Sequence, residues 1–468
     1  METVLEAMPA PDMINIRNWR MDTGREPVVR VGIVLDEDAR SNLEMGIPQE
    51  DYRLTAQGGP GEVRHAMPVV ARLTGGAIAV RAGDKAERVA SVWHIAPVRA
   101  QSLQHGQGIL VRNVMVGRGF HWQKRVDQTL CGRIELHAGR RGLIVVNELP
   151  LERYLAGVIT AEMSGRCPGD SLRAQCVVAR SWLLAFTEAK HEDDPFDRCN
   201  DDCCQRYQGT GDLTASAIEA VASTRGLALV DADGNVVDAN YSKCCGGITE
   251  SPEHVWDRSK PGLSAVADMP PGSPARRFFP LTENKLDEYL DGEWLRETDI
   301  YCSPNAVPQD RLGEYLGRVD EGGRYFRWTV THRRKEIEAL LRAGLEQAAD
   351  LVRLWDLKVV ERGVSGRAGE IELDFENGAG RRRRVRVRGE YRIREVLHPK
   401  FLYSSAFVVR IERDAHGLPP TVTLRGAGWG HGAGMCQIGA LGMALKGIGF
   451  EPILRHYYPR ANPQRVYD

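Results

Sequence analysis

The sequence lacks any long hydrophobic run and any excess of charge of one sign. No stretch approaches the roughly 18 consecutive apolar residues that span a bilayer, and the longest apolar run, around Leu143–Val146, suits a strand. The 62 basic and 63 acidic side chains leave a net charge of −1, so no long-range field attracts polyanions. We therefore expect neither a transmembrane span nor a nucleic-acid partner.

The N-terminal segment METVLEAMPAPDMINIRNW lacks both the basic start and the apolar stretch of about 7–15 residues that mark a secretory signal. Taken alone, this segment predicts a cytoplasmic protein. The composition, 42% hydrophobic and 27% charged, is that of an ordinary globular protein. At about 150 residues per domain, 468 residues predict two or three domains.

Short β-branched runs such as VVRVGIVL and LIVVN predict strands between about residues 28 and 146. Leu151, Leu155 and Ile159 then recur at helical spacing and predict a helix that ends near Met163. Pro168 opens a second predicted helix, which runs to about residue 190. The alternation between strands and helices that a nucleotide-binding fold requires is absent.

Further helices are predicted near residues 214–224, 285–294 and 335–345, and a hairpin is predicted around Asp233-Gly234. A β-rich stretch from 357 to 413 has breaks at Gly366 and Asn377-Gly378. We expect an α+β fold in which a strand-rich N-terminal region, a helical region and a β-rich inserted region surround one cleft. The expected division is a leader (1–27), a strand-rich domain (28–140), a core (141–265), a mixed then β-rich region (266–420) and a C-terminal segment (421–468) that returns to the core.

The basic run GRRRRVRVRG invites a nucleic-acid interpretation. However, Arg384, Arg386 and Arg388 alternate with Val385 and Val387, as in a half-buried strand with one solvated face. We favour the solvated strand. Binding of an acidic polymer is the alternative, and it requires these arginines to surround a groove.

Half of the ten cysteines fall within one 47-residue stretch: Cys199, Cys203, Cys204, Cys244 and Cys245. In HEDDPFDRCNDDCCQRYQG, the side chains of His191, Cys199, Cys203 and Cys204 are of the types that bind zinc, and four such ligands close a structural site. Adjacent cysteines make simple disulfide geometry awkward, although disulfides remain the alternative. We predict a structural metal rather than a catalytic one, because no coordination position is left open.

Three remote segments carry the remaining signal: NELPLERYLAGVITAEM with PGDSLRAQCVVARSW, then YSKCCGGITESPEHVW, then GAGWGHGAGMCQIGALGMALKGIGFEPILRHYYP. In order and spacing these segments resemble the signature blocks of the stage II sporulation protein D and amidase enhancer family. The resemblance is tight over about residues 140–260 and 420–460 and looser elsewhere. It implies lytic cleavage of peptidoglycan glycan strands.

By this resemblance Glu162, in the TAEM segment, is the catalytic acid/base. Glycosidases ordinarily use two carboxylates. In a lytic transglycosylase the 6-hydroxyl of muramic acid attacks the anomeric carbon, so one glutamate suffices and the product is a 1,6-anhydro sugar. Glu152 lies about 15 Å along the same predicted helix and about 80° around it, so a capping or surface role suits it better. From the residues alone, Glu162 is also compatible with a solvated helix end.

The resemblance further implies that the glycine-rich segment lines a glycan cleft. Closely spaced glycines let the backbone approach a ligand, and His431 and Gln437 offer polar groups to sugars. The segment lacks the GK[ST] of a phosphate-binding loop. The predicted substrate-binding residues are Gln175, Arg180, Tyr241, Ser242, Gly246, Gly247, Gly430, His431, Gly432 and Gln437. A purely structural role is the alternative for His431, for the glycines, and for Gln175 and Arg180.

The resemblance also bears on the metal, because some family members bind zinc in this segment. Cys199 and Cys204 match the family's cysteines best, Cys203 stands where a relative carries histidine, and the spacing of His191 differs. Cys244 or Cys245, which replace serine-like residues of the family's motif, is therefore an alternative fourth ligand.

Two functions follow from the resemblance. The first is a lytic transglycosylase, and the second is a peptidoglycan-binding module that activates a cell-wall amidase without cutting glycan. A zinc hydrolase is a third possibility and requires an exchangeable water on the metal. A wall-active protein works outside the cytoplasm, so the resemblance predicts the cell envelope although the N-terminal segment predicts the cytoplasm.

Overall fold

In the computed structural model the described residues are 14–120, 122–187, 190–291, 298–316 and 323–468. The chain forms two compact units. The first unit comprises Met1–Leu227, Glu314–Val319 and Gln464–Asp468, and the second comprises Ala228–Gly313 and Asp320–Pro463. The five-part division expected from the sequence is finer than this and stays a prediction.

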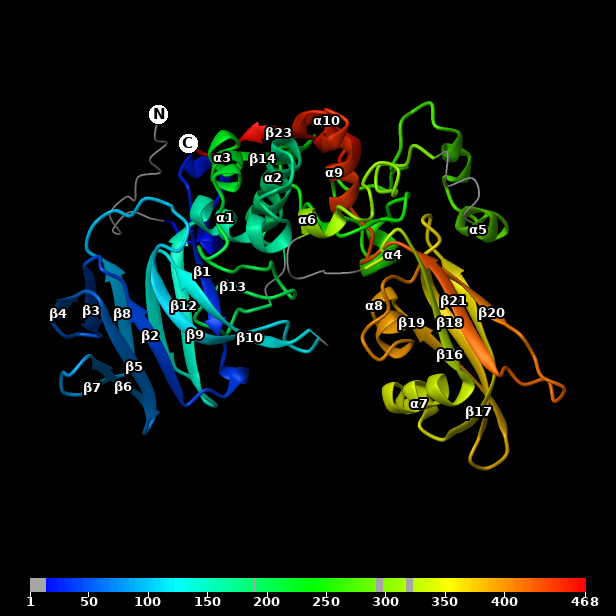
Figure 1. Cartoon of the computed structure of the whole chain (residues 1–468), viewed down its shortest axis with the longest axis horizontal. Coiled ribbons are helices and arrows are strands. Elements are labelled where there is room, and N and C mark those ends of the chain that lie inside the picture. Colours follow the sequence, from blue (N-terminus) through cyan, green and yellow to red (C-terminus); the bar gives the residue numbers. More distant parts are fainter. Residues whose placement is uncertain (1–13, 121, 188–189, 292–297, 317–322) are drawn as a thin grey trace. The chain divides into compact units, whose positions relative to one another are not determined.

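The first unit is built on two sheets, which contain the strands expected between residues 28 and 146 (Figure 1). The seven-stranded sheet has the order β13-β1-β12-β11-β8-β3-β4, and the six-stranded sheet has the order β10-β9-β2-β5-β6-β7. The sheets contact each other, and Trp93 Nε1 of β8 donates a hydrogen bond to the Ile78 carbonyl of β6 over 3.0 Å. The strand bounds are β1 (Val28–Val34), β2 (Asn42–Ile47), β3 (Tyr52–Ala56), β4 (Gly61–Arg64), β5 (Met67–Thr74), β6 (Ala77–Ala82), β7 (Arg88–Ala90), β8 (Val92–Pro97), β9 (Ile109–Val116), β10 (Lys124–Leu130), β11 (Arg133–Ala138), β12 (Leu143–Pro150) and β13 (Arg198–Cys199).

Helices α1 (Leu151–Glu162), α2 (Gly169–Ala185) and α3 (Ala215–Ser223) lie together at one end of these sheets (Figure 1). α1 follows directly on β12, and nearly all of its side chains are buried. Its predicted position is confirmed. α2 is shorter than predicted, because Phe186 adopts a left-handed conformation with φ 42° and ends the helix at Ala185. The short α6 (Leu312–Leu316) adds a turn of helix.

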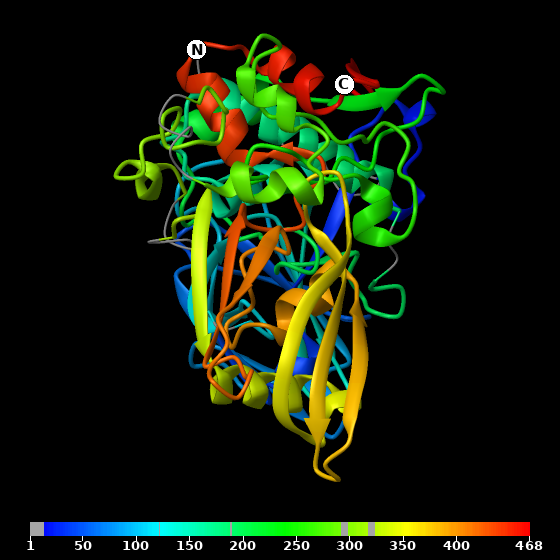
Figure 2. The same ribbon diagram turned by 90° about the vertical axis from the view of Figure 1, so that its right-hand side faces the viewer.

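The second unit contains two three-stranded sheets, ordered β16-β21-β20 and β17-β18-β19 (Figures 1 and 2). Side chains from both sheets and from helices α7 and α8 form one hydrophobic core. The strand bounds are β14 (Leu227–Asp231), β15 (Tyr241–Ser242), β16 (Arg327–Arg333), β17 (Leu351–Arg362), β18 (Ala368–Asn377), β19 (Arg382–Arg388), β20 (Phe407–Ile411), β21 (Thr421–Ala427), β22 (Met435–Cys436) and β23 (Ala461–Arg465). The helix bounds are α4 (Pro252–Trp256), α5 (Glu283–Leu290), α7 (Arg334–Gly344), α8 (Glu390–Val396), α9 (Gln437–Leu445) and α10 (Phe450–Tyr457).

The predicted α+β class is confirmed, and so are the breaks at Gly366 and at Asn377-Gly378, which join β17 to β18 and β18 to β19. The hairpin expected around Gly234 is only partly correct. β14 forms its first arm, but Val236 makes a single bridge to Val230, and the chain then continues to β15, which pairs with β22. Residues 292–294 of the helix predicted near 285–294 lie outside the described residues.

The arginine-rich strand β19 confirms the interpretation as a solvated strand. Val385 and Val387 are buried in the core, and the arginines that alternate with them are exposed. These arginines pair with acidic residues of β18; Arg384 lies 3.3 Å from Asp374, and Arg388 lies 3.1 Å from Glu370. The positive charge of these arginines is thus balanced by acidic side chains of the same sheet. Among the described residues, no helix is both long and apolar enough to cross a bilayer.

Candidate functional site

Glu162, the predicted acid/base, is the last residue of α1 and is half-buried. Its carboxylate accepts a hydrogen bond from the backbone N–H of Arg206 over 3.3 Å. Ile159 and Met163, on either side of it in the sequence, are 0% and 3% exposed. The helix end is therefore anchored in the core of the first unit, and Glu162 is held in a defined position rather than on a freely solvated helix end.

A second carboxyl group near Glu162 was not anticipated from the sequence. Asp202 Oδ1 accepts a hydrogen bond from Arg206 Nε over 2.6 Å. Burial raises the pKa of Asp202 to about 6; the charge of Glu162 adds to the rise, and that of Arg206 opposes it. The only sequence signal was the acidic pair in NDDCC, which the cysteine pattern obscured.

Glu152, at the other end of α1, has neither the capping nor the surface role expected of it. It is 1% exposed, and its two oxygens lie 3.0 and 2.6 Å from the guanidinium of Arg180, which is 0% exposed. The Gly226 N–H and the Tyr467 hydroxyl also donate to Glu152, over 3.0 and 2.6 Å. The expectation was wrong because a buried arginine on α2 requires a buried counter-charge.

This pairing places Arg180 in the core of the first unit and supports the structural role that the sequence left open. Gln175 lies on the same helix and is only 2% exposed. Contact with substrate stays a prediction for both residues. Neither side chain presents a surface to solvent.

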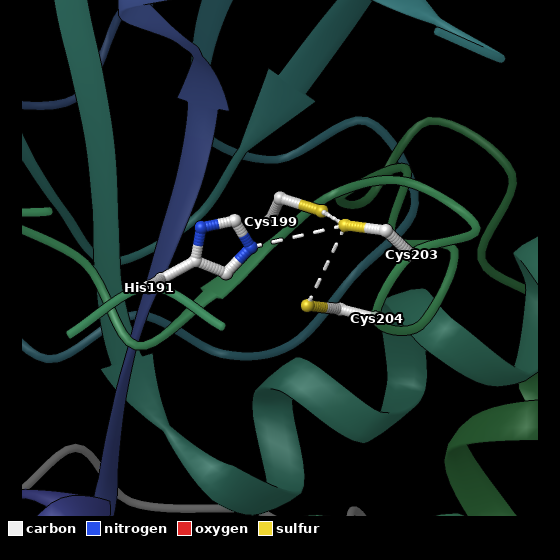
Figure 3. A group of neighbouring side chains, drawn as sticks. All are labelled: His191, Cys199, Cys203 and Cys204. Carbon is white, nitrogen blue, oxygen red and sulfur yellow. Dashed lines mark hydrogen bonds between the residues drawn. The ribbon is translucent and has the colours of Figure 1, made fainter. Parts of the chain in front are cut away.

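His191, Cys199, Cys203 and Cys204 come together beside the edge strand β13 (Figure 3). Their ligand atoms all lie within 4.8 Å of one another. Cys203 Sγ is 2.9 Å from Cys199 Sγ, 3.9 Å from Cys204 Sγ and 3.8 Å from His191 Nε2. Cys245 belongs to a different group of side chains in the second unit, so the four-residue set does not need the alternative fourth ligand.

The donor set fits a tetrahedral metal ion. Sulfur atoms about 2.3 Å from a common ion lie about 3.8 Å apart, so the Cys203–Cys204 spacing already matches, and the Cys199–Cys203 spacing would lengthen on binding. His191 Nδ1 is 2.9 Å from Asp194, the carboxylate–histidine arrangement that orients metal ligands. The four residues thus form a cluster that can hold a metal.

The charges of this cluster are coupled. Although burial opposes it, hydrogen bonds to Cys203 and Cys204 raise the pKa of His191 to about 10. Hydrogen bonds from Cys199 and Cys203 hold the pKa of Cys204 well below its usual value. A metal ion would take over this charge compensation, and its binding would release the imidazole proton.

In the second unit, the glycine-rich segment runs from the end of β21 to α9. Gly430 and Gly432 have φ values of 94° and 77°, which disfavour other residues. A Cβ atom at Gly432 would also lie 2.2 Å from the buried guanidinium carbon of Arg367. These glycines are therefore required by the fold, whether or not a ligand approaches them.

His431 is held in one neutral form. Its Nδ1 accepts a hydrogen bond from the Ala433 N–H over 3.1 Å, so the neutral ring carries its proton on Nε2. Burial, with the positive charges of Arg367 and other cations adding to the effect, lowers the pKa of His431 to about 3. Its ring centroid lies 5.0 Å from that of Trp256. A neutral imidazole against an indole is suited to contact with a sugar, not to proton transfer near neutral pH.

The remaining predicted substrate-binding residues of the second unit gather around β15 and β22. Tyr241 and Ser242 pair in parallel with Met435 and Cys436. Ser242 and Gln437 are 6% and 3% exposed. Gly246 and Gly247 have φ values of 79° and 110° and form the turn that follows. The cleft predicted between Glu162 and the glycine-rich segment would join residues of both units, and it stays a prediction.

Comparisons with known proteins agree with the motifs. Residues 139–230 match the family model "Stage II sporulation protein", and residues 252–434 match a domain of unknown function. An uncharacterized protein of Brachyspira hyodysenteriae is 26% identical over 318 residues, which are 68% of this chain and 67% of that protein.

Two named relatives come from Bacillus. Stage II sporulation protein D of Bacillus amyloliquefaciens is 24% identical and the match covers 67% of this chain and 74% of that protein. The amidase enhancer of Bacillus subtilis is 24% identical, with 65% of this chain and 39% of that protein covered. These matches confirm the predicted resemblance: residues 139–230 of this chain are similar to the stage II sporulation protein family.

Proposed function

We propose that this protein is a peptidoglycan lytic transglycosylase in which Glu162 is the single acid/base. The observation that carries the proposal is the position of Glu162. It ends a helix whose other side chains are almost all buried, yet its own carboxylate is only half-buried. A catalytic acid needs this combination of a fixed position and access to substrate.

The reaction needs one carboxyl group used twice. Protonated Glu162 donates its proton to the glycosidic oxygen as the bond from that oxygen to the anomeric carbon breaks. The 6-hydroxyl of the same muramic acid then attacks the anomeric carbon, and the Glu162 carboxylate accepts the hydroxyl proton. The glutamate is regenerated, no water is consumed, and the product carries a 1,6-anhydro ring.

The segment from Cys199 to Arg206 supports this role. The Arg206 N–H donates a hydrogen bond to one oxygen of Glu162, and the Arg206 side chain donates another to Asp202. We propose that zinc binds His191, Cys199, Cys203 and Cys204 as a structural ion. Zinc there would supply rigidity, because it would clamp the segment that carries Arg206 toward Glu162.

On the basis of the family resemblance, we propose peptidoglycan as the substrate and the cell envelope as the location. The neutral His431 and the Trp256 ring beside it are suited to sugar hydroxyls and N-acetyl groups. We propose that they form the glycan-binding wall of the second unit.

A second candidate is a glycan-binding module that activates a cell-wall amidase without cutting. The 24% identity to a protein named amidase enhancer favours it. The two candidates differ in the need for Glu162, since a binding module has no use for a proton donor.

The test incubates the full chain with denuded and with peptide-bearing glycan strands and analyses the products by mass spectrometry. We expect 1,6-anhydro-muramic products from the wild type and at least a hundredfold loss in Glu162→Gln, the usual range for a removed acid/base. The matched control is Glu219→Gln on α3, whose side chain is 74% exposed; it should keep full activity. A wild type that binds glycan but releases no product would favour the binding module.

A further inference from the structure

The second unit contains a group of side chains with no part in the proposed reaction. Cys245, Asp268, Cys302 and Cys436 come from four separate stretches of the chain, and their ligand atoms all lie within 4.8 Å of one another. Their exposures are 3%, 0%, 2% and 0%. A fully buried carboxylate beside these free thiols, with the buried Cys244 thiol next to Cys302 and Cys436, is costly unless something compensates its charge.

We propose that these four residues form a second, buried metal site for a thiophilic divalent ion of the zinc type, separate from the His191 cluster. Three thiolates and one carboxylate are a donor set that favours tetrahedral zinc. The Cys245 and Cys302 sulfurs are 3.7 Å apart, close to the roughly 3.8 Å edge of a zinc–thiolate tetrahedron.

Backbone amides already point at the sulfur atoms. Cys436 Sγ accepts hydrogen bonds from the N–H groups of Cys245 and Gly439, over 3.1 and 3.3 Å, and Cys245 Sγ accepts one from Gly247 over 3.3 Å. Cys436 is also the N-cap of α9, where the helix dipole stabilises negative charge. Amide donors of this kind favour thiolates, the form that binds metal.

Asp268 is oriented as a metal ligand would be. The Tyr457 hydroxyl donates to its Oδ1 over 2.5 Å, and His456 Nε2 lies 3.5 Å from the same oxygen. The other oxygen, Oδ2, lies 3.1 Å from Cys245 Sγ and faces the thiols. An outer group that holds one oxygen of a carboxylate while the second faces the ion is the usual support of a ligating carboxylate.

The backbone around the group is fixed before any ion binds. The Asp268 N–H donates to the Gly247 carbonyl over 2.9 Å, and the Tyr301 N–H donates to the Asp268 carbonyl over 3.0 Å. A Cβ atom at Gly439 would lie 2.5 Å from Asp268 Oδ2. Only glycine at this position therefore lets α9 approach the carboxylate so closely.

Positive charge lies behind the ligands. Arg327 donates to the Gly246 carbonyl over 2.9 Å, and the buried Arg367 donates to the Cys245 carbonyl over 3.4 Å. These guanidinium groups offset part of the excess negative charge that three thiolates and a carboxylate leave on a divalent ion. The ion would join the end of the glycine-rich segment, at Cys436, to the turns at Cys245 and Cys302.

The test counts metal in the full chain, purified without a histidine tag. We expect two equivalents of zinc by mass spectrometry in the wild type and one in the triple variant Cys199→Ser/Cys203→Ser/Cys204→Ser. Cys167→Ser is the control, a buried cysteine outside both clusters, and should change neither number. In the triple variant, added Co²⁺ should give sulfur-to-cobalt charge-transfer absorption that a chelator removes.

Substitutions of the ligand Asp268 provide a second test that does not depend on counting zinc. In the triple-variant background, Asp268→Cys should retain cobalt and gain charge-transfer intensity, because it adds a fourth thiolate. Asp268→Asn should weaken cobalt binding about tenfold or more. A triple variant that binds neither zinc nor cobalt, or peptide mapping that shows a Cys245–Cys302 disulfide in the purified wild type, would overturn the proposal.

Discussion

Two glutamates on one helix, Glu152 and Glu162, show how position within a fold decides what a carboxylate does. Glu152 lies in the first turn of α1 and is surrounded by donors from Arg180, Gly226 and Tyr467. Glu162 ends the same helix, is half-buried and meets the Arg206 N–H. Glu152 is a buried anchor of the first unit, and Glu162 has the exposure that the proposed catalytic role requires.

The largest expected effect tests the anchor. Glu152→Gln leaves the Arg180 guanidinium, 0% exposed, without a counter-charge, and should destabilise the first unit by about 3 kcal/mol or more. Urea unfolding, followed by tryptophan fluorescence, measures it. The double variant Glu152→Leu/Arg180→Met should be less destabilised than the sum of its single variants, because it removes both charges. A Glu152→Gln protein as stable as the wild type would show that Glu152 is not a structural anchor.

The next largest effect is expected from the metal-binding segment, from Cys199 to Arg206. If the proposed zinc is bound, its removal by a chelator, or Cys199→Ser, should lower the stability of the first unit by about 2–3 kcal/mol, the linkage expected for an ion present at a hundredfold excess over its dissociation constant. The proposed transglycosylase activity should fall with it, because the segment that carries Arg206 would be held less rigidly. Calorimetry with and without Zn²⁺ measures the first effect. The control Cys167→Ser should respond to the chelator as the wild type does.

The raised pKa of Asp202 predicts that the stability of the protein depends on pH. Its pKa is raised from 3.8 to about 6 in the folded state, so the folded protein binds more protons than the unfolded chain between these values. Stability therefore falls as pH rises from about 4 to 6, by about 2 kcal/mol from this group. Asp202→Asn should remove that fall, as measured by urea unfolding at several pH values. An unchanged pH dependence would contradict the raised pKa.

The smallest expected effect tests Glu162 itself. Because the Glu162 side chain is only half-buried, Glu162→Gln should change stability by less than about 0.5 kcal/mol while it abolishes the proposed activity. Thermal unfolding measures the stability change. A loss as large as that of Glu152→Gln would mean that Glu162 is a structural residue.

Local patterns in the sequence were sufficient for much of the fold. Helical spacing located α1, and the alternation of Val385 and Val387 with arginine located the solvated strand β19. The end of α2 was missed, because the left-handed turn at Phe186 has no glycine to announce it.

The candidate site was predictable to the extent that a motif or a donor type marks it. The TAEM segment indicated Glu162, and the histidine and cysteines of one short stretch indicated the cluster of Figure 3. Asp202 was missed because its raised pKa arises from burial beside Glu162, forty residues earlier in the chain.

Residues close together in the chain were sufficient to indicate the periodic elements, the family resemblance and the types of metal-ligating side chain. Only the tertiary structure decided which charged groups are buried and which distant side chains meet. Arg180 pairs with Glu152, and Cys245 meets Asp268, Cys302 and Cys436, because folding brings remote stretches within ångströms of one another. Burial and electrostatics depend on that proximity, which no local pattern encodes.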